Sequence, residues 1–339
     1  MAHLNDLSYF SIKEEEMKYR TLTGTGARVS RVCLGTMTFG GQVDEAESIR
    51  MVHRAIDAGV NFVDTADVYT KGASETIVGK ALKGKRNGVV LASKVANQSG
   101  QYKLKDTGLS RWHIINGVEA SLKRLDTDCL DIFYLHKPDY NTPLEESLAA
   151  FDHLVSQGKV IYVGMSNYAA WQVCQARWIC DKRSFSPPVV TQNVYNLVTR
   201  GIEQEFIPFI RELGIGLTVY NPLAAGLLTG KHRRDSGPVE GTRFELNKEY
   251  FGRYWHESNF QALDELMEIA KQAGKKPVEL AFQWLAAQDV VDSIIIGFTK
   301  MEHLEQNLTA WEGKLDSDTL KACDQAWSKI KGDVFQYNR

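Results

Sequence analysis

The stretch NFVDTADVY contains two of the residues best suited to proton chemistry, because Asp64 ends an apolar run and Tyr69 follows five residues later. A buried carboxylate is costly unless an opposite charge pairs with it. The run VVLASK ends in Lys94, and a buried Asp–Lys pair is tolerated where either charge alone is not. A lysine ammonium beside a phenol favours the phenolate, which predicts a lowered pKa for Tyr69. With His136 at the end of LDIFYLH, these side chains could hold and protonate a carbonyl oxygen, as carbonyl reduction requires.

Each of these residues also has an ordinary structural interpretation. An aspartate at a strand end often forms a turn or caps a helix, and a lone lysine or tyrosine there is usually an exposed rim residue. A single histidine could be a core residue with a satisfied hydrogen bond. Their joint occurrence at the ends of consecutive strands is what favours an active site.

The elements that must position these residues are short apolar runs that alternate with amphipathic segments. The strand candidates are residues 32–36, 61–65, 89–94, 130–136, 160–166, 189–193, 215–221 and 293–298. Segments between them, such as 46–59 and 109–125, place apolar residues three and four positions apart, as helices do. Continuous apolar strands that alternate with helices predict a parallel sheet, and eight such units predict a closed α/β barrel of the (β/α)8 type. An open, doubly wound sheet is the alternative architecture.

In such a barrel the active site lies at the carboxyl ends of the strands. Every predicted strand end carries a polar residue or a glycine, so these residues are expected to converge on one ring. In chain order they are Thr36, Asp64, Lys94, His136, Ser166, Gln192, Tyr220 and Gly297.

Two segments depart from the alternation of strands and helices. Residues 19–32 contain strand-like runs around a GTG turn and predict an N-terminal β-hairpin. Residues 222–258 follow the seventh strand and are too long for a plain connection, so they predict a long functional loop. We therefore expect an N-terminal extension at 1–16, a barrel domain at 17–330 and a C-terminal tail at 331–339.

The composition argues against several classes of function. The chain has 339 residues and a formal net charge of −2, and its lack of a basic run argues against a nucleic-acid surface. Its apolar runs are far shorter than the ~20 residues of a membrane helix. The N-terminus resembles no signal peptide, so we expect a cytoplasmic protein without membrane association. The cysteines form no CxxC pair and are expected to be reduced and mostly buried; they are Cys33, Cys129, Cys174, Cys180 and Cys323.

Other motifs do not support a site. His232, His256 and His303 lack ligand spacing, so no metal site is predicted. The stretch GLLTGKH around Lys231 resembles a phosphate loop but has the wrong spacing and no Ser or Thr after the lysine. The GTG at 24–26 precedes a strand instead of following one, so it is not a dinucleotide fingerprint.

The motifs NFVDTADVY, LASK, LDIFYLH, GMSN and IIIGFTKMEHLEQN resemble those of the aldo-keto reductase superfamily over about residues 17–330. The stretches GLSRWHIINGVEASLKRL, TFGGQ and NTPLEES resemble the branch that contains the voltage-gated potassium-channel beta subunits. The resemblance implies a TIM-type barrel that binds NADPH, extended across the barrel mouth. It also implies reversible reduction of aldehydes or ketones, which include sugar-like carbonyls, to alcohols.

By this resemblance, the family's catalytic tetrad falls on Asp64, Tyr69, Lys94 and His136. Tyr69 would be the general acid, Lys94 would tune it, Asp64 would hold Lys94, and His136 would orient the substrate carbonyl. The substrate pocket would include Met37 and Asn97 beside Tyr69 and His136.

The resemblance also implies which positions bind the cofactor. Ser166, Asn167 and Gln192 match the positions that bind the nicotinamide carboxamide, Tyr220 would stack on the nicotinamide ring, and Arg243 would lie near the 2′-phosphate. The full expected set is Thr36, Met37, Gln42, Asp64, Ser166, Asn167, Gln192, Tyr220, Asn221, Pro222, Leu223, Gly226, Lys231, Arg243, Gly297, Thr299, His303, Gln306 and Asn307. His303 and Gln306 depart from the usual residues at the adenosine end, which leaves both NADPH and NADH open, with NADPH favoured.

The departures from the channel subunits bear on the choice between two functions. Met37 and Asn167 stand where those subunits carry Trp and Arg, and His136 is retained where they replace the catalytic histidine. A retained histidine favours a working oxidoreductase with a small-molecule substrate over a cofactor-sensing regulatory subunit that docks on a channel-like partner. The channel branch often forms tetramers, so a homo-oligomer is among the expected states. Tyr254 and Trp255 either close over the ligand or pack within the long loop.

Overall fold

The computed structural model of this protein describes residues 17–99 and 105–331. The expected N-terminal extension at 1–16 lies outside the described residues, as does the expected tail at 331–339 except for Lys331, which is the last residue of a helix. The domain limits therefore stay predictions.

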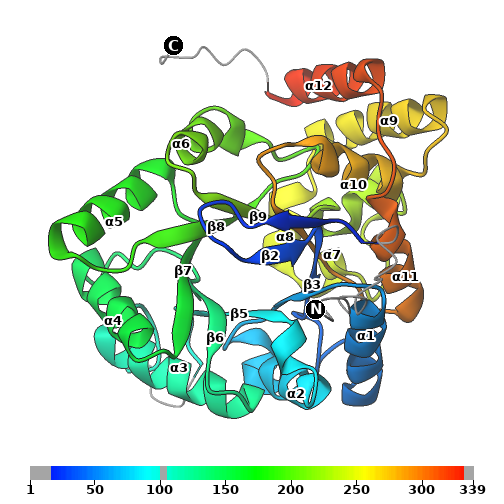
Figure 1. The fold of residues 1–339 in the computed structure, drawn as a ribbon. Coiled ribbons are helices and arrows are strands. Elements are labelled where there is room, and N and C mark those ends of the chain that lie inside the picture. Colours follow the sequence, from blue (N-terminus) through cyan, green and yellow to red (C-terminus); the bar gives the residue numbers. More distant parts are fainter. Residues whose placement is uncertain (1–16, 100–104, 332–339) are drawn as a thin grey trace, which may run out of the picture.

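Eight parallel strands close into a barrel in which the last strand pairs with the first (Figure 1). The barrel strands are β3 (Val32–Gly35), β4 (Phe62–Asp64), β5 (Val90–Val95), β6 (Leu130–Leu135), β7 (Val160–Ser166), β8 (Pro188–Val194), β9 (Gly216–Tyr220) and β10 (Ser293–Ile296). All eight predicted strands are confirmed, with ends that differ by no more than two residues. The alternative of an open, doubly wound sheet is wrong.

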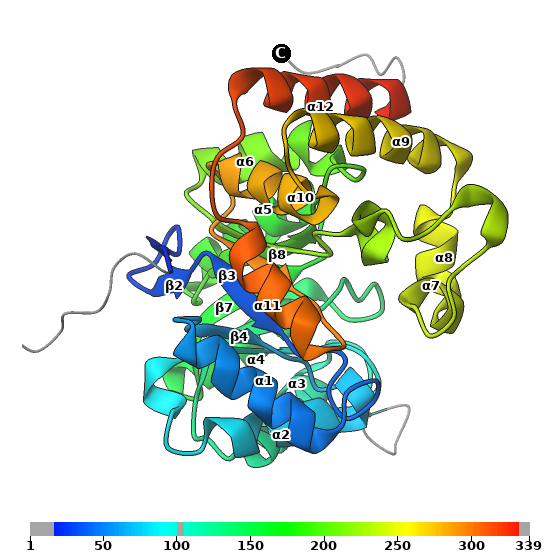
Figure 2. The same ribbon diagram turned by 90° about the vertical axis from the view of Figure 1, so that its right-hand side faces the viewer.

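Helices surround the barrel on its outer side (Figure 1). They are α1 (Glu45–Asp57), α2 (Ala73–Leu82), α3 (Arg111–Leu125), α4 (Leu144–Ser156), α5 (Ala170–Arg183), α6 (Phe206–Glu212), α10 (Pro277–Ala287) and α11 (Met301–Ala310). Two starts show how the sequence sets them: the side chain of Asp44 accepts a hydrogen bond from Glu47 N before α1, and Ser110 accepts one from His113 N before α3. Two more helices, α9 (Glu257–Gln272) and α12 (Ser317–Lys331), pack together at one edge (Figures 1 and 2).

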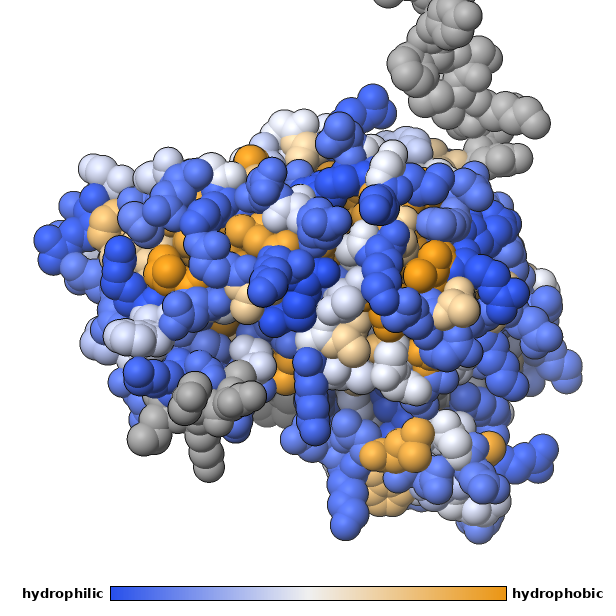
Figure 3. Space-filling view, turned by 90° about the horizontal axis from the view of Figure 1, so that it is seen from below, coloured by the Kyte–Doolittle hydropathy of each residue, from blue (hydrophilic) through white to orange (hydrophobic). Residues whose placement is uncertain are grey.

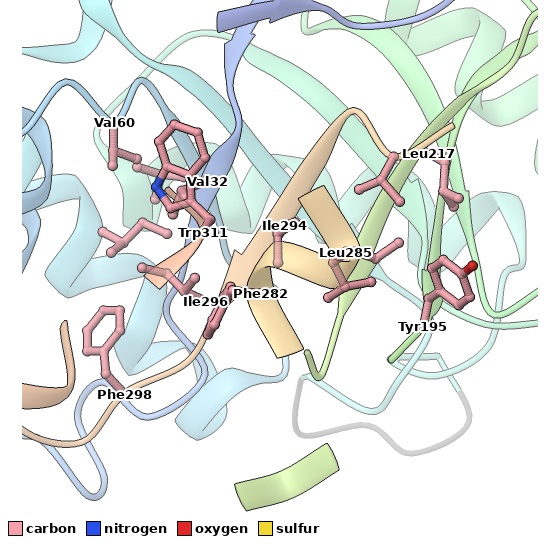
Figure 4. Packing of buried hydrophobic residues seen from close by; sticks show 14 of the residues in the cluster. Val32, Val60, Tyr195, Leu217, Phe282, Leu285, Ile294, Ile296, Phe298 and Trp311 are labelled. Carbon is pink, nitrogen blue, oxygen red and sulfur yellow. The ribbon is translucent and has the colours of Figure 1, made fainter. Parts of the chain in front are cut away.

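In most barrel strands, alternate residues face two different apolar clusters, as the two-residue period of a strand requires. In β10, Ile294 and Ile296 face outward and belong to the same cluster as Phe282 and Leu285 of α10 (Figure 4). Ile295 belongs instead to the cluster that fills the barrel interior. A strand buried on both faces reads as a continuous apolar run, which is why these strands were recognisable.

A two-stranded hairpin covers the amino-terminal end of the barrel. It consists of β1 (Tyr19–Thr21) and β2 (Arg28–Ser30), paired antiparallel, as predicted. Leu22 and Val29 of this hairpin enter the interior cluster. Thr23 Oγ1 donates a hydrogen bond of 2.9 Å to the buried Asp292 just before β10. The hairpin thus closes the end of the barrel opposite the carboxyl ends of the strands.

The segment between β9 and α9, residues 221–256, is called the arm below. It contains the short helices α7 (Arg243–Leu246) and α8 (Lys248–Tyr254) and the 3-10 turns Ala224–Thr229 and Arg234–Ser236. Figure 2 shows α7 and α8 at the opposite end of the molecule from the hairpin. The predicted long loop is therefore present, but part of it is helical.

On the face shown in Figure 3, apolar residues occur in small, separate groups among hydrophilic ones. No described helix has both the length and the apolar character needed to cross a membrane. All five cysteines are free; Cys33, Cys180 and Cys323 are buried, whereas Cys129 is half-buried and Cys174 is exposed.

Candidate active site

A cavity of about 1000 Å³ opens at the carboxyl ends of the strands. Each barrel strand, or the segment that directly follows it, contributes a residue to its wall. All the predicted site residues line this cavity except Lys94, which lies behind the wall in contact with Asp64 and Tyr69. The residues at the strand ends therefore converge on one cavity, as expected from the sequence.

The Asp64–Lys94 pair forms the floor of one end of the cavity. Lys94 Nζ lies 2.5 Å from Asp64 Oδ1 and donates a second hydrogen bond of 2.8 Å to Thr65 O. Both side chains are buried. Burial alone would lower the pKa of Lys94, but the Asp64 carboxylate and the Tyr69 hydroxyl raise it above its ordinary value. The Asp64 carboxylate therefore favours the charged form of Lys94.

Gln192 supports the other side of the same carboxylate. Its amide nitrogen donates a hydrogen bond of 2.8 Å to Asp64 Oδ2. The two oxygens of Asp64 are therefore held by different groups, which fixes the plane of the carboxylate. The resemblance assigned Gln192 to the nicotinamide carboxamide. In this structure the same side-chain amide also donates a hydrogen bond to Asp64.

Tyr69 places its hydroxyl 3.3 Å from Lys94 Nζ. The predicted lowering of the Tyr69 pKa is wrong in this structure, because the pKa is raised above its ordinary value. Burial is the largest cause and outweighs the opposing effect of Lys94. The phenol is consequently protonated, and the lysine offsets part of the cost of ionising it.

His136 follows β6 and faces Tyr69 edge-on, with ring centroids 6.0 Å apart. Burial, with the positive charges of Lys94 and Lys137, holds its pKa well below its usual range. Asn97 Nδ2 lies 3.3 Å from His136 Nδ1. Because an amide NH₂ only donates, Nδ1 accepts this hydrogen bond and Nε2 carries the hydrogen. His136 is therefore a neutral hydrogen-bond donor at its Nε2.

The far end of the cavity is rich in cations. Lys231, Arg243 and Lys300 line it together with His303. Burial lowers the pKa of Lys231, and the neighbouring charges of Arg243 and Lys300 lower it further. These cations repel one another, and a phosphate group bound between them would relieve the repulsion. The end of the cavity therefore fits a ligand that carries phosphate groups.

The main chain between the two ends is unusually curled. Asn221, Ala224 and Ala225 adopt positive φ values of 62°, 49° and 58°, and Gly226 has a φ of 100°. Asn221 Oδ1 stabilises this turn by accepting a hydrogen bond of 2.7 Å from Ala225 N. Non-glycine residues in this conformation cost free energy and cluster at ligand sites. The curl lies beside Lys231, and both contain positions that the resemblance assigns to the cofactor.

Sequence reasoning missed several residues of the cavity wall. Lys137 and Lys300 adjoin predicted residues, and their proximity in sequence was the available signal. Glu249, Tyr250 and Arg253 of α8 also line the cavity, but the arm has no clear period from which their direction could be read.

Tyr254 and Trp255 do not line the cavity. Tyr254 is buried, and its hydroxyl accepts a hydrogen bond from Asn221. Trp255 packs against Phe244, Phe260 and the buried His232. Of the two predicted alternatives, these aromatic residues pack within the arm. Among the described residues no cluster of His, Cys, Asp and Glu is suited to hold a metal ion.

Comparison with known proteins agrees with this geometry. A sequence model described as "Aldo/keto reductase family" matches residues 31–328. The chain is 37% identical over 301 residues to a probable voltage-gated potassium channel subunit beta of Oryza sativa subsp. japonica, which covers 87% of this chain and 91% of that protein. It is 37% identical over 330 residues to the uncharacterized oxidoreductase YrpG of Bacillus subtilis, over 94% and 98% of the two chains.

A further relative is aflatoxin B1 aldehyde reductase member 2 of Rattus norvegicus, 34% identical over 338 residues, or 94% of this chain and 90% of that protein. The resemblance read from the motifs is thereby confirmed, together with the branch that includes proteins named as channel beta subunits. The chain belongs to the aldo/keto reductase family.

Proposed function

We propose that this protein is an NADP(H)-dependent oxidoreductase that reversibly reduces an aldehyde or ketone to an alcohol, with Tyr69 as general acid. Membership of the family supports carbonyl reduction in general. The observation that carries the finer proposal is the contact between Tyr69 and the buried Asp64–Lys94 pair, with a neutral His136 beside it.

In this proposal the nicotinamide, when bound, supplies the hydride that adds to the carbonyl carbon. The Nε2–H of His136 donates a hydrogen bond to the carbonyl oxygen and orients it. As negative charge develops on that oxygen, Tyr69 transfers its phenolic proton, which completes the alcohol. Lys94 stabilises the resulting phenolate, and solvent returns the proton. Asp64 keeps Lys94 in place.

The fit of the cofactor rests on the cations at the far end of the cavity. Lys231 and Lys300 would hold the pyrophosphate, and Arg243 would hold the 2′-phosphate that distinguishes NADPH from NADH. Tyr220, at the carboxyl end of β9, would stack on the nicotinamide. The proposal therefore favours NADPH, with a small-molecule substrate and a cytoplasmic location, and homo-oligomer formation stays a prediction.

A second candidate is a regulatory subunit that binds NADP(H) and senses its redox state on a channel-like partner. The similarity to proteins named as potassium channel beta subunits favours it. His136 favours the enzyme, because a donor aimed at a carbonyl oxygen has no use in binding the cofactor alone.

Titration of the intrinsic tryptophan fluorescence with NADPH and NADH, followed by turnover assays on a broad panel of aldehydes and ketones, tests the proposal. We expect tight NADPH binding and rapid turnover of at least one carbonyl, and almost none by Tyr69→Phe. Tight binding with negligible turnover of the panel would favour the regulatory subunit. Failure to bind either nucleotide would contradict both candidates.

A further inference from the structure

His113 of α3 is buried but lies outside the wall of the cavity, and no role is assigned to it above. Its Nδ1 lies 2.8 Å from the carbonyl oxygen of Gly108, and its Nε2 lies 3.2 Å from Ser99 Oγ. Both partners belong to the connection between β5 and α3, which also carries Asn97 of the cavity wall. A single imidazole ring therefore bridges two points of the connection that places Asn97 in the site.

The hydrogen-bond partners determine the tautomer of the His113 ring. A carbonyl oxygen can only accept, so Nδ1 carries a hydrogen and donates it to Gly108 O. In the neutral ring Nε2 then has no hydrogen, and it accepts from the hydroxyl of Ser99. His136 has the opposite tautomer, with its hydrogen on Nε2, because Asn97 donates to its Nδ1. The two histidines are consequently distinguishable by spectroscopy.

The start of α3, which carries His113, is fixed by its neighbours. Ser110 caps the helix by accepting a hydrogen bond of 3.2 Å from His113 N. Just before the helix, Leu109 N donates to Asp139 Oδ2 at 2.7 Å, and Leu109 O accepts from Ser147 Oγ at 2.7 Å. Asp139 follows β6 and Ser147 lies in α4. The position of His113 is therefore set by the next strand and helix of the barrel.

Gly108 links this position to the end of β5. Its N–H donates to Ala96 O at 2.8 Å, directly before Asn97. Its φ is 78°, and a β-carbon there would lie 2.6 Å from Asp139 Oδ2, so this close approach requires a glycine. Gly108 is thus bonded to Ala96 through its nitrogen and to His113 through its oxygen.

Asn97 lies between two bonded positions. Ala96 before it accepts the hydrogen bond from the glycine, and Ser99 two residues after it donates to His113. The Nδ2 of Asn97 lies 3.3 Å from His136 Nδ1. Because this hydrogen bond is already long, a small displacement of Asn97 would break it and release the ring of His136.

We propose that His113 is a positioning residue that fixes Asn97 and, through it, the ring of His136. It does so by bridging Gly108 and Ser99. A buried side chain outside the cavity thereby sets the direction of the Nε2–H that meets the carbonyl oxygen. The catalytic consequence rests on the proposed function, whereas the positioning is a property of the free protein.

Nitrogen-15 NMR of the histidine rings tests the positioning without cofactor or substrate. We expect a ring with its hydrogen on Nδ1, which is absent from His113→Phe, and one with its hydrogen on Nε2, which is absent from His136→Gln. In His113→Phe the His136 signals should shift or broaden. Identical His136 signals in the wild type and this variant would overturn the proposal, as would a His113 ring with its hydrogen on Nε2 alone.

Three further variants separate positioning from a general loss of structure. Ser99→Ala removes one contact at a half-buried position and should shift the His136 signals by less, so it carries the test if His113→Phe does not fold. His113→Asn retains a donor near the place of Nδ1 and should restore part of the wild-type signal. His53 of α1 also contacts a main-chain carbonyl, with its Nε2 2.9 Å from Ala81 O, and His53→Phe is the matched control. Shifts of the same size in His53→Phe would overturn the proposal.

Kinetics with saturating NADPH test the consequence. We expect His113→Phe to lower kcat about tenfold, or about 1.4 kcal/mol in activation free energy. NADPH affinity should change by less than about twofold, because His113 lies outside the cavity wall.

A double-mutant cycle tests whether the effect passes through Asn97. Asn97→Ala removes the contact with His136, so His113→Phe should add almost nothing to it. Additive effects would mean that the two residues act independently and would overturn the proposal. Absence of turnover by the wild type would count against the proposed function alone, because the NMR result does not depend on it.

Discussion

Lys94 Nζ lies 3.3 Å from the Tyr69 hydroxyl, and the ammonium is buried. Two opposing effects therefore act on the same phenol. Burial raises the pKa of Tyr69, and the lysine lowers it but does not compensate fully. Tyr69 is therefore protonated in the free protein, and Lys94 lies close enough to stabilise the phenolate. Such an acid is suited to transfer its proton when negative charge develops on a substrate oxygen.

Replacement of Tyr69 by Phe is expected to remove nearly all carbonyl reduction, because the proton donor is lost. A general acid contributes about 10²- to 10⁴-fold to a rate, so kcat should fall within that range. NADPH affinity, measured by fluorescence, should stay nearly unchanged. Carbonyl reduction by Tyr69→Phe at the wild-type rate would contradict the assignment of Tyr69 as the general acid.

The Asp64–Lys94 pair is expected to behave as a unit in stability measurements. Lys94→Met leaves the Asp64 charge buried with Gln192 as its remaining side-chain donor, so the free energy of unfolding should fall by about 3–5 kcal/mol. The double variant Asp64→Asn, Lys94→Met removes both charges and should recover much of this loss. Urea unfolding of the two single variants and the double variant measures the coupling. Equal and additive losses would contradict a coupled pair.

Arg243 is expected to determine the preference between the two nicotinamide cofactors. A hydrogen bond to a charged group contributes about 1.5–3 kcal/mol, so Arg243→Met should weaken NADPH binding by at least about tenfold. NADH lacks the 2′-phosphate and should bind about as before. Fluorescence titrations of the wild type, Arg243→Met and the control Arg234→Met provide the comparison. Equal weakening for both nucleotides would show that Arg243 does not read this phosphate.

Asp67 is expected to make stability fall as the pH rises. Burial raises its pKa to about 7, and the nearby Glu75 raises it as well, while Ser99 and Arg124 oppose the shift. The folded protein therefore keeps a proton that the unfolded chain loses near pH 4, so stability decreases between about pH 4 and pH 7 and then levels off.

Asp67→Asn removes this cost and should raise the free energy of unfolding at pH 8 by about 1–3 kcal/mol, with little change at pH 4. Urea unfolding at the two pH values measures it. Asp235→Asn, at an exposed position of the arm, is the control. A gain of the same size at both pH values would rule out titration of Asp67 as the cause.

The fold was predictable because its strands are buried on both faces. Apolar runs such as 130–136 and 160–166 have no polar alternation, which is typical of a parallel barrel, and the polar residues at their ends mark the mouth. Asp64, Lys94 and His136 could therefore be assigned to one site before any distance was known. The strand ends themselves were less certain by one or two residues, because hydrogen bonding decides them and apolar character does not.

The parts that could not be predicted depend on tertiary packing. Tyr250 and Arg253 face the cavity because the arm folds back over the mouth, and their sequence gives no period from which this direction follows. The pKa of Tyr69 was expected to fall on the basis of one neighbour, whereas burial, which sequence does not measure, decides its sign. The packing of Trp255 against Phe244 and Phe260 likewise depends on tertiary contacts that the sequence does not show.

The hairpin at the amino-terminal end of the barrel has a consequence for the order of events. Among the described residues, the hairpin β1–β2 and the interior cluster fill the amino-terminal end of the barrel, and the cavity that contains Asp64 and Tyr69 opens at the carboxyl ends of the strands. We therefore expect cofactor and substrate to enter and leave by that same end. A dinucleotide bound along the cavity wall would fill the deeper part of the cavity, and a small carbonyl substrate would bind nearer the entrance. We therefore expect an ordered sequential mechanism, in which the nucleotide binds first and dissociates last. Product-inhibition patterns measure this order, and a random pattern would show that the two ligands can pass each other.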